Sequence, residues 1–177
     1  LPTHRLVSGL PELTAEDVKA ALAGHVELEE TGSGKAGAER AWELIETDGE
    51  QNVFGFGTAK DGKWLFGRVK DWSIMKTLAA DQTDAWHALG VSILHKMILD
   101  HLVQKKYPDA KLQFKYVHLL EETIEAQRDN SCQLACLVPP AQISHVEEIA
   151  SKFEKMPAKS TFFYPKLLSG LVFNALE

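Results

Sequence analysis

The chain has 177 residues, of which 45% are hydrophobic and 25% are charged, and its formal net charge is −6 at pH 7. This composition is typical of one soluble globular domain that is long enough to bury a core. The acidic balance argues against nucleic acid or an anionic membrane as the main partner. No apolar run approaches the roughly 18 residues that a membrane-spanning helix needs, and the N-terminus lacks a signal-peptide pattern, so a cytoplasmic protein is expected.

The start of the chain lacks an initiator methionine and reads as part of a strand, whereas natural termini are usually more polar. We therefore interpret residues 1–177 as a single domain, the C-terminal domain of a longer protein. On this interpretation the expected partner is the N-terminal domain of the same protein, and a homodimer is left open.

The first third of the sequence predicts one strand and two helices. Residues 1–8 are expected to form the strand. Residues 13–24 are expected to form a helix, because Thr14 can cap its N-terminus and acidic residues follow in its first turn. Residues 29–37, rich in glycine and acid, are expected to form a loop, and residues 38–47 a helix with one apolar face.

A β-hairpin is expected next. Residues 53–60 and 63–70 flank Asp61-Gly62, the sequence of a two-residue type I′ turn. Alternation along the second strand places Leu65 on one face and two aromatic side chains on the other, Trp64 and Phe66.

The remaining residues alternate between helical and strand patterns. Residues 84–105 form the longest apolar stripe of helical period. The β-α-β-α-β order that follows favours parallel pairing, so the fold class is α+β, with a mixed sheet on which helices pack. Later strands are expected at residues 112–118, 132–138, 160–164 and 171–176. Later helices are expected at residues 121–128 and 142–155.

Metal and thiol chemistry are not expected. The seven histidines show neither the spacing of a helical metal pair nor a nearby Cys-x-x-Cys. Cys132 and Cys136, if both lie in one strand, are roughly 13 Å apart, too far for a disulfide, so we expect two buried free thiols.

Two short segments echo phosphate-binding loops. Residues 32–35 (GSGK) lack the earlier glycine of a Walker loop and are followed by alanine, which favours a solvated turn. Lys159-Ser160-Thr161 follows Ala158 where that loop needs glycine, so a Walker loop is excluded. Two readings of this segment stay open: an anion site made of a lysine, two hydroxyls and backbone N–H groups, or a surface loop whose hydroxyls cap its own backbone.

The first strand carries a second candidate. Alternation puts Thr3 and Arg5 on one face and His4 on the other. Arg5 has the planar fork that binds phosphate or carboxylate. The alternative is an ordinary edge strand with polar residues.

Several of these segments recur together in a known family. They are residues 2–7 (PTHRLV), Leu94-His95, and residues 156–166 (MPAKSTFFYPK) with residues 170–172 (GLV). Together they resemble the C-terminal half of a prokaryotic family known only as domain of unknown function 1015, over the whole chain. Leu119 follows His118 where the family often has an acid.

The resemblance implies a function for the intact protein. The other half of the family carries a motif similar to those of the ParB/sulfiredoxin-like group, which includes a nucleotide-dependent free serine kinase. The intact protein would then bind nucleotide and act as a kinase-like phosphotransferase on a small anionic metabolite. Residues 1–177 show no catalytic triad and no converging carboxylates, so by themselves they are expected to be inert and to hold no cofactor.

Two hypotheses follow. In the first, this domain helps to form a phosphate- or carboxylate-binding site. In the second, it is a non-catalytic structural or partner-binding domain, and its terminal motif locks the chain end against the sheet. The candidate anion ligands are Arg5, Lys159, Ser160, Thr161 and Lys166, and the further candidates are Thr3, His4, His95, His118 and Tyr164.

Overall fold

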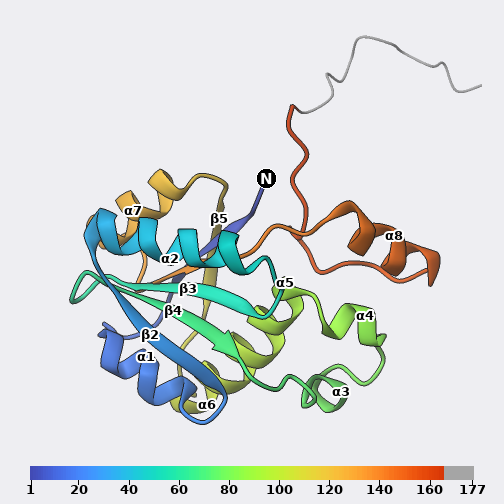
Figure 1. Cartoon of the computed structure of the whole chain (residues 1–177). Helices are drawn as coiled ribbons and strands as arrows, with labels where there is room; N and C mark the ends of the chain where they lie inside the picture. Colours follow the sequence, from blue (N-terminus) through green and yellow to red (C-terminus); the bar gives the residue numbers. More distant parts are fainter. Residues whose placement is uncertain (166–177) are drawn as a thin grey trace, which may run out of the picture.

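A computed structural model describes residues 1–165, in which six strands form one sheet in the order β2-β4-β3-β6-β1-β5 (Figure 1). The strands are β1 (His4–Ser8), β2 (Val26–Ser33), β3 (Val53–Thr58), β4 (Lys63–Val69), β5 (Gln113–Val117) and β6 (Leu134–Leu137). The helices are α1 (Ala15–Leu22), α2 (Gly34–Asp48), α3 (Met75–Leu78), α4 (Asp84–His87), α5 (Gly90–Ser92), the π-helix η1 (Ile93–Val103), α6 (Gln104–Lys106), α7 (Leu120–Arg128) and α8 (Ile143–Ser151).

The α+β class is confirmed, but the expected parallel pairing is wrong. Every neighbouring pair of strands in the described sheet is antiparallel. β1 inserts between β5 and β6, so that Leu6 pairs with Lys115 on one side and with Ala135 on the other. β5 and β6, which α7 connects, are therefore not neighbours in the sheet. The order of elements along the chain does not reveal that β1 lies between them.

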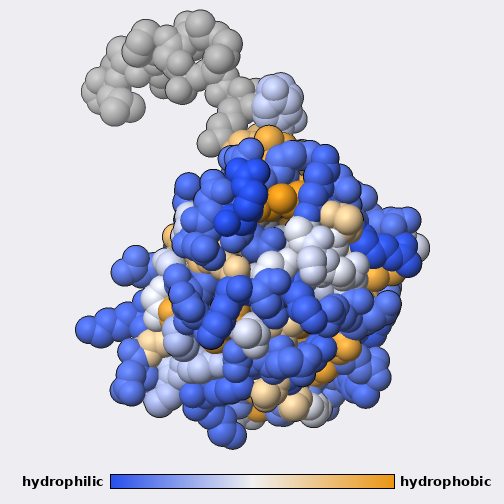
Figure 2. Space-filling model, turned by 90° about the vertical axis from the view of Figure 1, so that its left-hand side faces the viewer, coloured by the Kyte–Doolittle hydropathy of each residue, from blue (hydrophilic) through white to orange (hydrophobic). Residues whose placement is uncertain are grey.

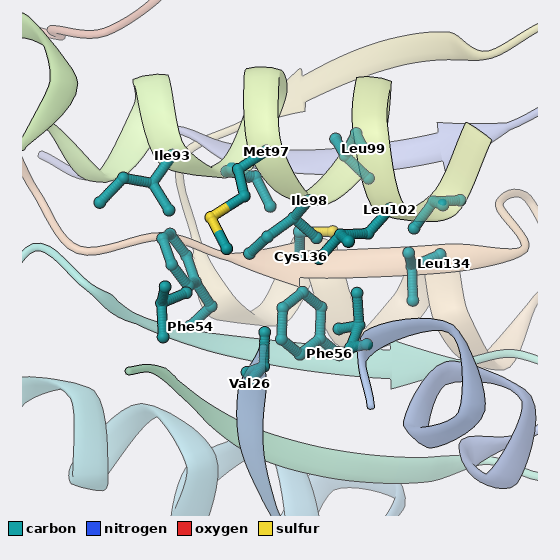
Figure 3. Close-up of a cluster of buried hydrophobic side chains, with 14 of the residues drawn as sticks. Val26, Phe54, Phe56, Ile93, Met97, Ile98, Leu99, Leu102, Leu134 and Cys136 are labelled. Carbon is teal, nitrogen blue, oxygen red and sulfur yellow. The ribbon is translucent and has the colours of Figure 1, made fainter. Parts of the chain in front are cut away.

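The two faces of the sheet are covered by different helices. α2 and α7 cover one face, over a core that includes Ala41, Ile45 and Trp64. α1 and η1 cover the other, larger core (Figure 1). Figure 3 shows side chains of η1, such as Met97 and Ile98, projecting toward the aromatic rings of β3.

The hairpin of β3 and β4 is confirmed, with a different turn. The connection has four residues, 59–62, and only Gly62 among them has a positive φ, of 67°. A type I′ turn would need positive φ at both central residues, which Asp61 does not have. The facial alternation is confirmed, because Trp64 and Phe66 pack in the α2–α7 core and Leu65 packs in the η1 core.

The acidic segment expected to be a loop is the edge strand β2. Its carboxylates are paired across the strands, with Lys63 Nζ 2.9 Å from Glu30 Oε1 and Lys70 Nζ 2.6 Å from Glu27 Oε1. Residues 32–35 form the junction between β2 and α2 rather than a solvated turn. A Cβ on Gly37 would lie 2.5 Å from the carbonyl carbon of Gly32, so the two backbones approach closely there.

The long helix expected at residues 84–105 is broken. Leu89 adopts an extended conformation (φ −68°, ψ 134°) between α4 and α5. Gly90 N donates to Gln51 Oε1 at 3.0 Å, and a Cβ on Gly90 would lie 2.7 Å from Gln51 O. This tertiary contact overrides the helical periodicity.

The apolar face expected for residues 142–155 is mostly not buried. Of its expected inward positions only Ile149 is buried, while Phe153 is 99% exposed. The helix α8 stands to one side and packs on α4, because both faces of the sheet are already covered (Figure 1).

The ends of the described chain also differ from expectation. Residues 160–164 form no strand and lie as an extended loop beside the N-terminus. The strand expected at residues 171–176 lies outside the described residues. None of the helices described within residues 1–165 is long and apolar enough to cross a membrane. The face shown in Figure 2 is dominated by hydrophilic residues.

Candidate functional site

The main candidate site is a cavity of about 860 Å³ at the β5 edge of the sheet. It lies between β5, the start of the chain and residues 159–165, which we call the terminal segment. A volume of this size is in the usual range for small-molecule sites. The fold thus brings the two ends of the described chain together around one hollow.

The polar side chains of the cavity are cationic or neutral. They are Lys159, Lys115, Thr3, Thr161, Tyr116 and His118, and no Asp or Glu is among the described lining residues. Neither lysine forms an ion pair with another described residue. Lys115 also borders a second hollow with acidic residues such as Glu122 and Glu125, so among the lysines of residues 1–165 we assign Lys159 to this cavity.

Aromatic rings form the rest of the wall. Phe114 has its ring edge against His95, with centroids 5.0 Å apart. The Tyr116 ring lies 5.3 Å from the Arg5 guanidinium carbon. His118 and Phe162 stack at 3.7 Å with planes 28° apart, and Phe163, at the rim, is 64% exposed.

Arg5 lies behind this wall and is completely buried. Its Nε donates to His95 Nε2 at 3.2 Å, and its terminal nitrogens donate to the backbone oxygens of Thr3 and of Lys159, the latter at 3.0 Å. Burial lowers the pKa of Arg5 to about 10, so it stays charged at neutral pH. Its charge is compensated by oxygen dipoles and the Tyr116 ring face. Arg5 therefore fixes the terminal segment and does not itself line the cavity.

Two histidines beside Arg5 are held neutral. Burial, with the charges of Arg5 and His118 adding to it, lowers the pKa of His4 to about 3. Burial, with Arg5 and Lys96 adding to it, lowers the pKa of His95 to about 4. Both rings use a bare nitrogen as an acceptor: His4 Nδ1 accepts from Val138 N at 3.2 Å, and His95 Nε2 accepts from Arg5. A neutral ring is what each of these bonds requires.

These lowered values predict an acid-sensitive fold. Below pH 6.5 the unfolded chain protonates both histidines while the folded chain does not, so stability present above pH 6.5 is lost as the pH falls toward 4. We expect the unfolding free energy, measured by urea denaturation, to drop by about 3 kcal/mol from pH 6.5 to 5.0. Each histidine contributes roughly 1.5 kcal/mol, because the unfolded imidazole is already half protonated at pH 6.5. His4→Asn keeps an acceptor for Val138 and should remove about half of the drop. The exposed His25→Asn is the matched control, and an unchanged pH slope in His4→Asn would contradict the assignment.

Two further contacts fasten the terminal segment, and local hydrogen bonds order the residues around it. Leu1 N donates to Phe162 O at 3.0 Å, and Phe162 stacks on His118. Ser160 Oγ donates to Pro157 O at 2.5 Å, which closes a turn before the cavity. His118 Nδ1 lies 3.1 Å from Pro2 O and 3.4 Å from Thr3 Oγ1, so it ties the start of the chain to β5.

The structure brings most of the residues proposed from the sequence to the cavity, some as lining residues and others as supports behind its wall. Lys159, Thr161, Thr3 and His118 line the cavity, whereas Arg5 and His95 support it from behind. Ser160 is buried, and its hydroxyl donates within its own turn. This agrees with the alternative in which the hydroxyls of the loop cap its own backbone. His4 lies on the opposite face of the sheet, in an edge contact with Trp42 whose ring centroids are 5.1 Å apart. Tyr164 is 77% exposed, and Lys166 lies outside the described residues.

Six lining residues were not among the candidates named from the sequence. Phe162, Phe163 and Pro165 belong to the terminal segment, and the other three come from the edge strand, where Phe114 and Tyr116 alternate with Lys115. The alternation was visible, but nothing in the sequence indicated that β5 would pair with β1 and form the cavity wall.

Other kinds of site find no support in the described residues. Within residues 1–165 no group of three or more His, Cys, Asp or Glu side chains could hold a metal ion. Cys132 and Cys136 are free and buried as expected, and burial raises the pKa of Cys132 to about 11 and that of Cys136 further. At neutral pH both are protonated thiols, not nucleophiles.

Comparison with known proteins gives no assignment. No family model matches the chain, and no curated protein or solved structure matches it either. The resemblance to domain of unknown function 1015 therefore stays a prediction, and the argument for function rests on the cavity.

Proposed function

We propose that this domain binds a small anion, a phosphate or carboxylate group, in the cavity beside Lys159. The observation that carries the proposal is the charge of the lining: lysine and hydroxyl groups, with no carboxylate among the described lining residues of an acidic chain. In the intact protein the site would serve a nucleotide- or phosphate-handling enzyme, as the family resemblance implies.

The electrostatics favour an anion at this place. A lysine without a protein counter-ion gains a charge-assisted hydrogen bond when a phosphate or carboxylate binds. The hydroxyls of Thr3 and Thr161 add donors that suit the same oxygens. The buried charge of Arg5 lies next to Lys159, since it bonds to the carbonyl of that residue, and adds a positive potential from behind.

Arg5 has a positioning role in this proposal. Its hydrogen bond to Lys159 O holds that residue at a φ of 58°, in the left-handed region that non-glycine residues avoid. Lys159 is thereby held at the cavity, and direct contact of Arg5 with the anion is not required.

Phosphate-dependent thermal stability tests the proposal. At 10 mM phosphate and a dissociation constant near 1 mM, binding should stabilise the fold by about 1.4 kcal/mol relative to chloride at equal ionic strength. Lys159→Ala should lose this gain. Lys155→Ala is the matched control, because Lys155 is equally exposed on the same stretch of chain but does not line the cavity.

The control separates specific binding from the general stabilising effect of phosphate salts. A gain of the same size in the wild type and in both variants would show only the salt effect and would contradict the proposal. The absence of any gain would do the same.

One observation favours the second hypothesis, a structural lock. The terminal segment is fastened by Arg5, by the N-terminal amine and by the His118 stack, and these contacts hold it without any ligand. If phosphate has no specific effect while loss of Arg5 frees the segment, the terminal segment is a structural lock. The domain would then have a structural or partner-binding role.

A further inference from the structure

We infer that the ligand of this cavity is an anion carried on a planar aromatic or heteroaromatic ring. This inference rests on the proposed anion site and names the class of molecule that would fill the rest of the cavity. The cavity volume, about 860 Å³, far exceeds what a bare phosphate or carboxylate occupies. The part that the anion leaves empty must suit a second chemical group.

The wall of that second part is aromatic. Four of the ten lining residues are Phe or Tyr, against 8% aromatic residues in the whole chain, and His118 adds a fifth ring. Aromatic faces bind planar rings by offset stacking or edge contacts, in addition to the burial of apolar area. Inorganic phosphate and open-chain acids have no ring and cannot make these contacts.

The inner rings are ordered before any ligand arrives. Phe114 is fixed by its edge contact with His95, and Tyr116 is fixed against Arg5. Arg5 is buried and His95 is partly buried, so the rings that they contact do not have to be immobilised when a ligand binds. Such preorganisation lowers the entropic cost of association.

Phe163 supplies an open platform at the rim. Its side chain lines the cavity and is 64% exposed, and no ring contact joins it to another described residue. It follows Thr161 by two residues, so the ring and the hydroxyl that would bind the anion belong to one short segment. A ligand that spans both must carry its anionic group within a few bonds of its ring.

Calorimetric titration of the full chain with matched ligand pairs tests this inference. The first pair is inorganic phosphate and phenyl phosphate, and the second is ribose 5-phosphate and adenosine monophosphate. We expect the ring-bearing member of each pair to bind about 5- to 50-fold more tightly, as stacking of one ring on aromatic side chains provides. Adenosine, which has the ring without the anion, should bind more weakly than its monophosphate.

Two phenylalanine variants locate the effect. Phe163→Ala should reduce the ring advantage severalfold, with native circular dichroism because its side chain is exposed. Phe153→Ala is the matched control, since Phe153 is 99% exposed and lies away from the cavity, and it should keep the full advantage.

The outcomes separate the two proposals. Equal affinity within each pair overturns the aromatic inference and leaves the anion site standing. Adenosine binding as tightly as its monophosphate contradicts the anion site. Absence of binding by every ligand overturns both, and a ring advantage that survives in Phe163→Ala removes that residue from the site.

Discussion

Replacement of Arg5 by methionine is expected to lower the unfolding free energy by about 3 kcal/mol, from the balance of two opposing effects. Three acceptors, one in a buried and two in partly buried hydrogen bonds, lose their donor, at about 1–3 kcal/mol each. Relief of the buried charge offsets part of this, since the lowering of the Arg5 pKa from 12.5 to about 10 corresponds to roughly 3 kcal/mol. The loss of hydrogen bonds outweighs the relief. Urea denaturation measures the difference.

The same variant should release the terminal segment. Without the Arg5 bond to its carbonyl, the backbone around the exposed Lys159 is no longer held, and trypsin should cleave after this residue several times faster than in the wild type. Arg40→Met is the control, because Arg40 is an exposed arginine whose contact is a surface pair with Glu43. If Arg5→Met were as stable and as resistant to trypsin as the control, Arg5 would not hold the segment.

Truncation of Trp64 should cost still more, about 4 kcal/mol for Trp64→Ala, which is typical of a large buried ring. The indole is fully buried, and its Nε1 donates to Gln127 Oε1 at 2.9 Å. Gln127 in turn donates to the backbone oxygens of Thr58 and Lys63, the two residues that flank the hairpin turn. The variant therefore leaves both a cavity and an unpaired buried amide oxygen in the α2–α7 core.

Two further variants check the reason for this loss. Trp64→Phe keeps most of the ring and should lose about half as much, from the missing N–H donor and part of the volume. Trp72→Ala removes a partly buried tryptophan with no equivalent hydrogen bond, and should be milder. Equal losses for Trp64→Ala and Trp72→Ala in the same denaturation experiment would contradict the account of the buried Trp64–Gln127 pair.

Local features of the fold could be predicted from the sequence. Thr14 caps α1 as expected, because the capping box it forms with Asp17 needs only four consecutive residues. The hairpin and the facial alternation of Trp64 and Leu65 were likewise specified by neighbouring residues. In each case the deciding contacts are short in sequence.

Features decided by distant contacts could not be predicted. The insertion of β1 between β5 and β6 depends on pairings more than one hundred residues apart. The break at Leu89 depends on Gln51, and the exposure of Phe153 depends on helices that already cover the sheet. The acids of β2 were read as a loop because their lysine partners lie at the start of β4 and directly after its end.

The candidate site was predictable in part for the same reason. Lys159 and Thr161 were found because a compact motif carries them, and that motif includes Phe163. The hydrogen bonds of Arg5 could not be predicted, since an arginine on a strand gives no sign of whether its guanidinium faces an anion or a backbone carbonyl. The carbonyl of Lys159 is 154 residues away in the chain.

The most direct test of the anion site is an NMR titration of the full chain, labelled with ¹⁵N, with inorganic phosphate at constant ionic strength. We expect saturable shifts at the backbone amides of Thr3, Lys159 and Thr161, with much smaller shifts at Lys155. Lys159→Ala should abolish the shifts at Thr3 and Thr161. Shifts that are absent, that never saturate, or that appear equally around lysines outside the cavity, such as Lys70 and Lys76, would contradict the anion site.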